Sequence, residues 1–393
     1  MAVAFPFSAV WGEPVRESLA WKTRIGESQT AAEQRRAHRT APRRSLTADL
    51  VLDRSDKAFF DQLMHGPGAG ELYVPIWHDA QLTPAPAAAG TKAIYCSTAY
   101  RDFAAGRFAI LRGEDARSFE VVTIDGVLAD RITTTTPLAQ TWPARTRLFP
   151  VRLGRFLSQP QPRVKNDRLW TVPLTLRLIE PCDWPTLALP MYRSHPVYEV
   201  APDWTEDLSA AYKRFLKVLD NDIAAPHVVD TAGSAFTLQS HRWVMDGAAE
   251  HDAFRRLLYT LRGRQVSVWM PTHQDDLWLT STLPALSVLM QVENVGFTAY
   301  GYGRPGRRDV RIQLGNGTVF HRRITSSAVV SSSVEQIGID APLGVSVAPR
   351  EVLRISFLRL VRSDDDQVEI QHQTDIEGVA EASISFRSLR DEL

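Results

Sequence analysis

The chain has 393 residues, of which 44% are hydrophobic and 23% charged, a composition typical of a folded protein with two or three domains. Its 45 lysine and arginine residues balance its 45 aspartate and glutamate residues, which argues against a strongly basic nucleic-acid-binding protein and against a disordered acidic chain. Cys96 and Cys182 are too few for a disulfide framework or a four-cysteine zinc site, and no apolar run approaches the roughly 20 residues of a membrane span.

The two ends carry no clear targeting signal. Residues 1–11 are apolar, but they lack a basic region and contain Pro6, so we expect no secretory signal. Residues 390–393 imitate an endoplasmic-reticulum retention signal, which has no meaning without secretion. We therefore expect a protein that is made in the cytosol.

The first half of the chain predicts one helix followed by strands. Residues 59–64 have helical spacing, Ser55 can cap the helix, and Gly66-Pro67 stops it. Asp125-Gly126 predicts a hairpin turn, because both central positions of a type I′ turn require positive φ. Apolar runs predict strands at residues 72–77, 107–111 and 119–124.

The second half repeats this order of elements. Asp246 or Gly247 precedes a helix that includes residues 254–261 and ends near Gly263, and Asn316-Gly317 predicts a second hairpin turn. Strands are predicted at residues 266–270, 310–314, 352–360, 368–372 and 382–386. The fold class predicted from these elements is mainly β with a few helices (α+β).

Short matches in the same order indicate that one domain is written twice. Within residues 58–82 and 253–277, which align without a gap, the matches are Ala58, Phe59, Leu63, Gly68, His78 and Leu82 with Ala253, Phe254, Leu258, Gly263, His273 and Leu277. Further anchors are Pro14-Val15 and Glu17 with Pro196-Val197 and Glu199, Trp21 with Trp204, Asp125-Gly126 with Asn316-Gly317, Arg131–Thr133 with Arg323–Thr325, and Leu176-Arg177 with Phe386-Arg387. We predict a tandem duplication with domains 1–181 and 182–393, divided by the stiff connector Pro181–Pro185.

One segment fits two interpretations. The apolar residues between Trp204 and Leu219 have helical spacing, yet Tyr212, Leu216 and Val218 also fit one face of a strand. The duplication places this segment opposite residues 31–44, which are too polar for a core-facing helix. We therefore favour a long β-hairpin arm in both copies.

A glycine-rich segment matches a dinucleotide-binding pattern. Gly301–Gly306 fits G-x-G-x-x-G, but that chemistry requires a helix to begin there. Pro305 intervenes and residues 309–312 continue as a strand, so we predict a turn. No G-x-S-x-G elbow of a serine hydrolase is present, and Cys96 lies in a strand-like run as a buried hydrophobe.

Two histidine and aspartate clusters occupy matching places after the repeated strand. His78-Asp79 in one copy, and His273 with Asp275-Asp276 in the other, could bind a metal or move protons. Each copy offers one histidine and one or two carboxylates, with no third ligand at a useful spacing. We favour a loop in which aspartate caps a turn and histidine packs on Trp77 or Trp269.

Charged and aromatic clusters favour interface or core roles. The basic cluster lacks the interleaved aromatic residues that would stack bases, so it predicts a solvated or interface-facing arm; it comprises Arg35, Arg36, His38, Arg39, Arg43 and Arg44. Residues 364–366 are three aspartates and predict a solvated hairpin tip. The ten tryptophans, among them Trp142-Pro143 and Trp184-Pro185, could form a sugar-stacking platform, but we favour core and subunit-interface positions.

An ordered set of segments carries a family resemblance. They are residues 14–21 (PVRESLAW), 33–35 (EQR), 41–44 (APRR), 137–143 (PLAQTWP), 229–233 (VDTAG), 240–243 (SHRW), 305–309 (PGRRD) and 355–358 (ISFL). Their order through nearly the whole chain resembles a family of tail proteins of long-tailed bacteriophages, encoded near the tape-measure protein in siphophages of Pseudomonas and related hosts. The resemblance implies a structural protein of the virion, assembled in the host cytoplasm and similar in role to distal tail or baseplate hub proteins. It implies no catalytic, cofactor-binding or metal-binding residue, so none is carried over.

The predicted architecture fits that role. A β-sandwich or barrel with a hairpin arm and a flanking helix resembles the building block of tail tubes, in which arms supply strand edges to neighbouring subunits. Tail tubes are sixfold and central spikes are usually threefold, so a trimer of a duplicated chain would present six similar domains. We hypothesise a trimeric sixfold-to-threefold adaptor; a hexamer is the rival.

The expected partners are other copies of this chain and the tail tube, tape measure, hub and fibre proteins, with no specific nucleic-acid binding. A carbohydrate-binding module of the tail, built on the tryptophans, is the alternative function. A cell-wall hydrolase would need a carboxylate pair or an open zinc site. The sequence offers neither, so we expect no enzyme and no cofactor.

Overall fold

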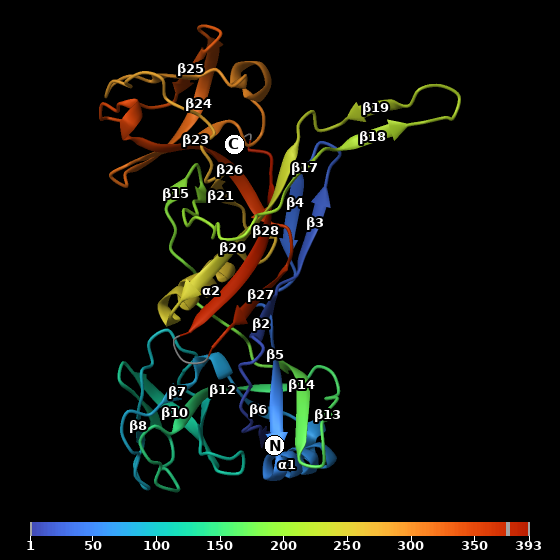
Figure 1. The fold of residues 1–393 in the computed structure, drawn as a ribbon, viewed down its shortest axis with the longest axis vertical. Coiled ribbons are helices and arrows are strands. Elements are labelled where there is room, and N and C mark those ends of the chain that lie inside the picture. Colours follow the sequence, from blue (N-terminus) through green and yellow to red (C-terminus); the bar gives the residue numbers. More distant parts are fainter. Residues whose placement is uncertain (1, 375–377, 392–393) are drawn as a thin grey trace.

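The computed structural model describes residues 2–374 and 378–391, and it consists of two β-rich units arranged along one long axis (Figure 1). Strands hold 45% of the residues and helices 10%, so the prediction of a mainly β protein with a few helices is confirmed. We call the region up to residue 180 the first unit and the region from residue 181 the second unit. Neither α-helix of the described chain is long and apolar enough to cross a membrane.

The first unit contains one α-helix, α1 (Arg54–His65), and two short 3₁₀ helices, η1 (Pro67–Ala69) and η2 (Trp77–Asp79). Its strands are β1 (Val3–Ala4), β2 (Val15–Ala20), β3 (Thr23–Glu27), β4 (Glu33–Ala37), β5 (Arg43–Asp53), β6 (Leu72–Pro75), β7 (Gln81–Leu82), β8 (Ala93–Tyr95), β9 (Phe108–Arg112), β10 (Phe119–Leu128), β11 (Arg131–Thr134), β12 (Arg147–Phe156), β13 (Arg163–Val164) and β14 (Leu169–Leu178).

The second unit contains α2 (Ala248–Leu261), one π-helical turn, η3 (Phe297–Gly301), and one 3₁₀ turn, η4 (Pro349–Glu351). Its strands are β15 (Met191–Tyr192), β16 (His195–Pro196), β17 (Ala210–Lys213), β18 (Leu216–Leu219), β19 (His227–Asp230), β20 (Phe236–Asp246), β21 (Val268–Pro271), β22 (Leu289–Glu293), β23 (Asp309–Leu314), β24 (Val319–Val329), β25 (Val334–Ile339), β26 (Val352–Ser363), β27 (Gln367–His372) and β28 (Val379–Ser388).

Strand pairing follows the same order in both units. In the first unit, β12 pairs with three strands: β6, β9 and β14. From β9 the pairing continues through β10 and β11 to β8. β14 pairs with β5 and β13 as well. In the second unit, β26 pairs with β21, β23 and β28, β23 continues through β24 and β25 to β22, and β28 pairs with β20 and β27. Each unit also places its α-helix directly after the long strand β5 or β20.

The alternation of β5 shows why these segments form strands. Leu46, Ala48, Leu50 and Leu52 are buried and the residues between them are more exposed, as expected for a strand with one face on the core. These four side chains join a core that includes Phe60 and Leu63 of α1. The second unit has its own cores, one of them around α2.

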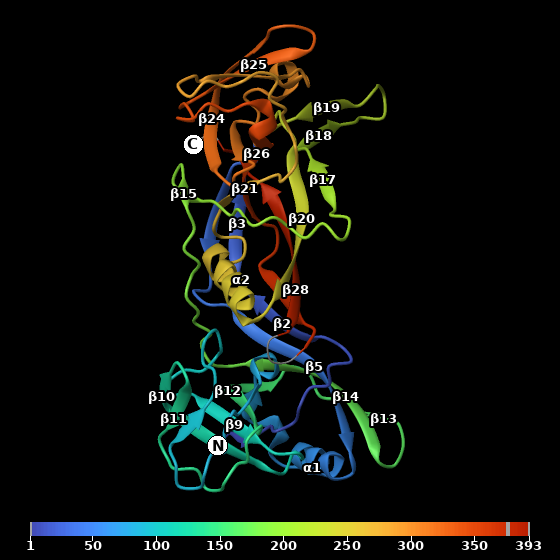
Figure 2. The same cartoon turned by 60° about the vertical axis from the view of Figure 1, so that its left-hand side comes forward.

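A single antiparallel sheet crosses the boundary between the units. Its strands lie in the order β13, β14, β5, β2, β27, β28, β20 and β17. The central pair, β2 with β27, joins the two units, and β13 and β17 are its outer strands. Figure 2 shows β5 and β2 rising from the lower unit toward β28 of the upper unit.

The predicted hairpin turn at Asp125-Gly126 is wrong, whereas the one at Asn316-Gly317 is confirmed. Asp125 and Gly126 lie inside β10, where a bulge shifts the pairing with β11, and the turn lies at residues 129–130. A Cβ at Gly126 would lie 3.0 Å from the Thr133 hydroxyl, so glycine suits the bulge. Gly317, by contrast, has a φ of 87° in the turn between β23 and β24.

Some of the proposed sequence anchors do not occupy corresponding positions. Val197 pairs in parallel with Trp269 of β21, just as β1 pairs in parallel with β6 in the first unit. Pro196-Val197 therefore corresponds to β1 and not to Pro14-Val15. Arg131–Thr133 lies in β11, but Arg323–Thr325 lies in β24. Leu176-Arg177 and Phe386-Arg387 do correspond, because β14 on β5 and β28 on β20 have the same register.

Two further tryptophans were matched wrongly. Trp204 follows Asp203, whose N–H donates to the Arg242 carbonyl of β20, and Trp11 follows Val10, whose N–H donates to the Asp49 carbonyl of β5. Trp204 therefore corresponds to Trp11 and not to Trp21. These mismatches arise because short identities recur by chance in strands of similar composition.

The helix ends differ slightly from the prediction. Ser55 lies inside α1, and Asp53 is the N-cap residue, without a side-chain capping bond. α2 follows Gly247, as predicted, and ends where Arg262 adopts the left-handed conformation just before Gly263. The predicted connector is extended and packs on α2, because Trp184 Nε1 donates to Asp252 and the Tyr259 hydroxyl to the Cys182 carbonyl.

Candidate assembly interface

Strand β2 belongs to the first unit by sequence, yet it completes the sheet of the second. It pairs with β5 on one side and with β27 on the other, in six residue pairs from Val15 with His372 to Ala20 with Gln367. Leu19 and Trp21 are buried in the apolar core around α2. The first unit therefore donates a strand and two core side chains to the second.

The hairpin that follows β2 lies on the second unit, and we call residues 23–37 arm 1. Glu33 accepts two hydrogen bonds from the Arg362 guanidinium, both of 2.8 Å, and Glu27 accepts one from Arg387. The Asp366 carboxylate accepts the Thr23 N–H at 2.6 Å. Charge-assisted bonds of this kind fix arm 1 in one position.

A second hairpin has opposite surroundings, and we call residues 216–230 arm 2. Figures 1 and 2 show its strands β18 and β19 projecting from the upper unit. Ile223 at its tip is 88% exposed, and five further large apolar residues of the arm are also exposed: Leu216, Val218, Leu219, Val228 and Val229. Each unit thus has a hairpin arm, as predicted, but the arms lie at residues 23–37 and 216–230 and not at the predicted segments 31–44 and 204–219. One arm is docked, while the other carries an uncovered apolar surface.

The arms touch at one point. The Thr231 hydroxyl, at the base of arm 2, donates to the Gln29 carbonyl at the tip of arm 1 over 2.6 Å. The tip of arm 1 therefore reaches the base of the next arm. This contact shows how far an arm extends over the unit on which it docks.

A buried ionic network lies beneath the junction. Glu17 of β2 accepts hydrogen bonds from Arg44 at 2.5 Å and from Arg255 of α2 at 2.6 Å. Arg44 also donates to Asp102, which receives Arg152 as well. Since Arg255 comes from the second unit and the other four residues from the first, this network ties the units together. Trp184 of the connector covers the Arg255 guanidinium, at 4.7 Å from its ring centroid.

Charge pairing overcomes burial at this network. Burial alone raises the pKa of Glu17, but Arg255 and Arg44 outweigh it and hold that pKa well below its usual value. Burial lowers the pKa of His78 well below its usual value, and His372 adds to this. Glu17 is therefore charged and His78 neutral in the folded protein near pH 7.

His78 lies in this network and not against Trp77, which corrects that prediction. Its ring stacks on His372 at 3.9 Å with an interplanar angle of 2°. Asp79 accepts the Asp102 N–H at 2.9 Å, a bond to a segment 23 residues away and not the predicted cap of its own turn. Sequence reasoning missed the rest of the network because its members come from distant segments.

Glu17, His78 and His372 bring three metal-ligating atoms within 4.8 Å of one another. Arg255 occupies the position that a cation would need, since its Nη2 lies 2.6 Å from Glu17 and 3.2 Å from His78 Nε2. A metal ion there would face the repulsion of two guanidinium groups in a buried site. The three residues serve the ionic junction and do not fit a metal.

The matching cluster in the second unit is divided. His273 is buried with a φ of 56°, Asp275 is exposed, and Asp276 accepts the Phe357 N–H at 2.8 Å. Within the described residues these three form no group of metal-ligating atoms. Asp276 therefore holds the edge of a strand, and the predicted packing of His273 on Trp269 is not among the ring contacts of the described chain.

The glycine-rich segment forms a turn, as predicted. Residues 302–308 lead from η3 directly into strand β23, so no helix begins there. A Cβ at Gly301 would lie 2.8 Å from the Phe297 ring, which explains the glycine. This segment offers no pyrophosphate-binding helix terminus.

The charged clusters are less solvated than predicted. Arg44 is buried in the junction, whereas Arg36, His38 and Arg43 are exposed. Asp366 is not a free hairpin tip, because it binds Thr23 of arm 1 and the Arg264 N–H. Cys96 is buried, as predicted, and Cys182 is partly buried; both are free.

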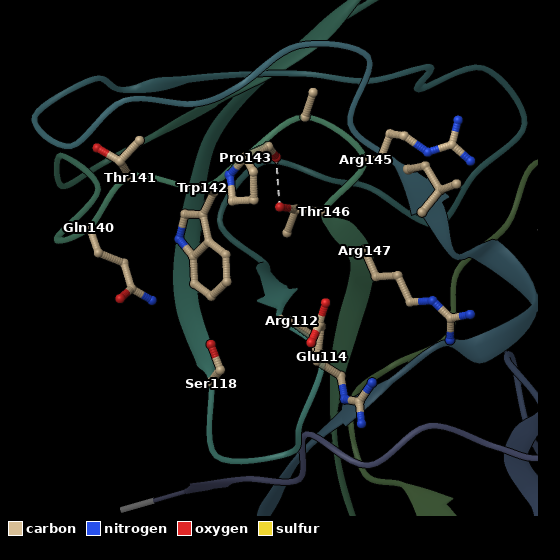
Figure 3. A pocket seen from close by; sticks show the side chains of 13 residues that line it. Arg112, Glu114, Ser118, Gln140, Thr141, Trp142, Pro143, Arg145, Thr146 and Arg147 are labelled. Atoms are coloured by element: carbon tan, nitrogen blue, oxygen red, sulfur yellow. Dashed lines mark hydrogen bonds between the residues drawn. The ribbon is translucent and has the colours of Figure 1, made fainter.

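Figure 3 shows a surface hollow of about 750 Å³ in the first unit. Arg112, Arg145 and Arg147 line it, with Glu114 as the one carboxylate among its described lining residues. Trp142 points into this region, but it is only 3% exposed and its Nε1 donates to Glu120. The hollow therefore offers neither an open tryptophan platform nor a carboxylate pair.

The signal for the buried network is visible in the sequence in retrospect. In residues 15–19 the side chains at 15, 17 and 19 share one face, so Glu17 lies between the buried Val15 and Leu19. A charged residue at an inward position of a strand indicates a buried partner. Comparisons with models of protein families and with curated protein sequences find no match to this chain.

Proposed function

We propose that the protein is a structural component of a bacteriophage tail tip, where it joins the tail tube to the central hub or fibre. The observation that carries this proposal is the contrast between a docked arm and an exposed apolar arm on one chain. An apolar hairpin that projects into water requires a partner surface. The sequence resemblance supplies the setting in which such a surface is found.

We also propose that the two units, with a boundary near residue 181, arose by tandem duplication of a tail-tube-like β domain. The shared order of strand pairs supports this proposal. The bulge at Ile124 and Gly126, where β10 pairs with β11, has its counterpart at Ile324 and Ser326, where β24 pairs with β25. The two arms also have the same number of residues between the partners of their first strand pair, Thr23 with Ala37 in arm 1 and Leu216 with Asp230 in arm 2.

The duplication leads to a symmetry hypothesis. Three chains would place six similar units in one ring, so a trimer could join a sixfold tube to a threefold spike. A hexamer with one unit of each chain in the ring is the alternative. The partners would be the tail tube, tape measure, hub and fibre proteins, and the location would be the virion.

The deciding experiment has two parts. Light scattering on the purified full chain measures its stoichiometry, and quantitative mass spectrometry of purified phage tails measures the copies in each particle. Three copies in each tail would support the adaptor, and six would overturn the trimer in favour of a distal tail ring. Absence of the chain from purified tails would overturn the tail-tip proposal itself.

Two exposed tryptophans favour a second candidate function, glycan binding during host attachment. Trp204 is 50% exposed and Trp278 is 47% exposed, so each presents part of an aromatic face to solvent. A glycan array probed with the full chain tests this function. Binding that is lost in Trp204→Ala or Trp278→Ala would support it, and an array without signal would exclude it.

A further inference from the structure

The docked arm shows which surface the exposed arm requires. β17 pairs with β20 in the register in which β2 pairs with β5, so that Ala210 lies where Glu17 lies. Arm 1 begins with the pair Thr23 and Ala37, and arm 2 begins with the pair Leu216 and Asp230. Each arm can therefore be matched residue by residue with the other.

The arginines that hold arm 1 have counterparts on the first unit. Arg387 of β28 lies where Arg177 of β14 lies, because the strand pairs of β28 with β20 and of β14 with β5 have the same register. Arg362 of β26 likewise lies where Arg155 of β12 lies, because Arg362 pairs with Arg387 and Arg155 pairs with Arg177. The first unit thus repeats the pair of arginines on which an arm docks.

These counterparts form a cationic surface without an arm on it. The Nε of Arg177 is buried and has no hydrogen-bond partner among the described residues. Arg177 and Arg43 both lower the pKa of Arg39, after a larger effect of desolvation, so the three guanidinium groups lie close together. Arg155 is exposed and pairs with Glu71 of its own unit at 2.9 Å.

Arm 2 carries the complementary charge. Asp220 lies where Glu27 lies, four residues after the first strand pair of its arm, and so matches the residue that binds Arg387. Asp222 lies where Gln29 lies. In the docked arm, Gln29 contacts Thr231, and the residue of the first unit that corresponds to Thr231 is His38. Asp222, docked in the same way, would therefore lie at His38, which is next to Arg39. Acidic residues at the tip of arm 2 thus match a basic surface.

Some polar residues of arm 1 and of the second unit correspond to apolar residues of arm 2 and of the first unit. Leu216 and Val228 of arm 2 lie where Thr23 and Arg35 lie in arm 1. On the first unit, Leu157 corresponds to Asp364 of the second unit. The Leu157 N–H donates to the Thr175 carbonyl of β14, and the Asp364 N–H donates to the Ser385 carbonyl at the matching position of β28. Leu157 is 48% exposed. Apolar residues on the arm thus coincide with an exposed apolar residue on the surface that matches it.

The two outer strands of the sheet, β17 and β13, differ in the backbone groups that they point outward. Ser209 bonds β20 through its carbonyl, so the N–H groups of Ala210 and Tyr212 point outward from β17. Lys165 bonds β14 through its N–H, so Pro162, three residues earlier, points outward from β13 and offers a carbonyl but no N–H. The outward edge of β13 therefore has an N–H at Val164 but none at Pro162, whereas β17 has outward N–H groups at both Ala210 and Tyr212.

We propose that arm 2 of one copy docks on the first unit of a second copy of this chain, over Arg177 and Arg155, with β17 beside β13. This inference rests on the proposed function as an assembly protein and names its partner surface. A second copy is required because arm 2 projects from the upper unit while the first unit lies at the other end of the molecule (Figure 1). The contact is head-to-tail, so it builds rings or chains of alternating first and second units.

Cross-linking between two distinguishable copies tests this contact. One full-length chain carries Asp220→Cys and the other, with a different tag, carries Arg177→Cys, both with Cys182→Ser because Cys182 is only partly buried. A short bismaleimide is expected to join the two different copies in most molecules. The matched control replaces Arg177→Cys by Arg168→Cys, which lies on an exposed loop of the same unit, and should give little product.

Charge reversal gives the second readout. Asp220→Arg and Arg177→Glu are each expected to lower the association constant at least tenfold in light scattering, and the double variant should recover most of it. A monomeric wild-type chain, or links between two Asp220→Cys copies, would overturn the proposed contact. Those results leave the tail-tip proposal to its own test, the presence of the chain in purified tails.

Discussion

Arm 1 and arm 2 are hairpins of equal length in matching positions, yet one is embedded and the other is exposed. Arm 1 is held by Glu33 and Glu27 on arginines of the second unit, and β2 beneath it is central in a sheet. Arm 2 keeps an acidic residue, Asp220, where Glu27 lies, but it exposes several apolar side chains and adjoins the outer strand β17. Our proposal explains this difference: one contact is permanent within the chain, whereas the other would be made between molecules.

The ionic junction should give the largest effect when it is broken. In Glu17→Ala, Arg44 and Arg255 lose their shared buried partner, so we expect the free energy of unfolding to fall by about 3–5 kcal/mol. Urea unfolding followed by tryptophan fluorescence measures this change. Glu369→Ala is the matched control, because Glu369 is exposed in the paired strand β27 and should cost less than about 0.5 kcal/mol. Equal losses in the two variants would contradict the role of Glu17.

Releasing arm 1 should have a smaller effect. Glu33→Ala removes two hydrogen bonds to Arg362 and leaves that buried guanidinium partly unpaired, which should cost about 1.5–3 kcal/mol. Limited proteolysis should then cut within residues 28–32, at the tip of arm 1, faster than in the wild type. Glu13→Ala, at an exposed turn, provides the control. An unchanged rate of cleavage would show that arm 1 is held by its strand β2 alone.

The elements of both arms could be predicted from sequence, but their surroundings could not. Alternating apolar residues and turn glycines indicate strands locally, so a hairpin arm near residues 204–219 and the turn at Gly317 could be predicted, although the arm itself lies at residues 216–230. The turn predicted at Gly126 is wrong because β10 continues through this position and changes its pairing partner there from β9 to β11. The sequence of a single strand does not show such a change of partner. A local signal does not report which distant strand will pair.

The candidate interface shows the same limit. Glu17 and His372 are 355 residues apart in sequence and meet at 3.2 Å across the β2–β27 pair. The inward position of Glu17 in its strand indicates that some buried partner exists, but not which one. His78 was considered as a metal ligand and expected instead to pack on Trp77, and only the three-dimensional arrangement shows that Arg255 fills the place of a cation beside it.

Acid should loosen the docked region. Burial lowers the pKa of His251, which lies beside His372, to about 4, with His372 contributing, and holds the pKa of His78 well below its usual value. The unfolded chain binds these protons near pH 6.5, so the stabilisation is complete above that pH and is lost as the pH falls toward 4. Each such histidine contributes up to about 1.4 kcal/mol per pH unit, less for His251 because it is partly exposed.

Thermal unfolding between pH 7 and pH 4 measures this slope. His78→Asn should flatten it, because the asparagine side chain does not titrate. His65→Asn, on the exposed end of α1, should leave it unchanged. A wild-type midpoint that rises toward pH 4 would contradict the assignment of neutral, buried histidines.

The exposed arm should show the smallest effect on folding and a clear effect on association. Val218→Asp and Ile223→Ser change side chains that are exposed in the isolated chain, so the free energy of unfolding should move by less than about 0.5 kcal/mol. In an interface these positions are apolar contacts, and a charge at Val218 would be desolvated on docking. Light scattering should therefore show fewer assembled copies at equal stability, whereas Ile25→Asp, at the matching position of the docked arm 1, should destabilise the chain itself. If Val218→Asp and Ile223→Ser lowered the stability of the chain without changing its assembly, arm 2 would be a structural hairpin of its own unit. The contrast between the two arms would then have no functional meaning.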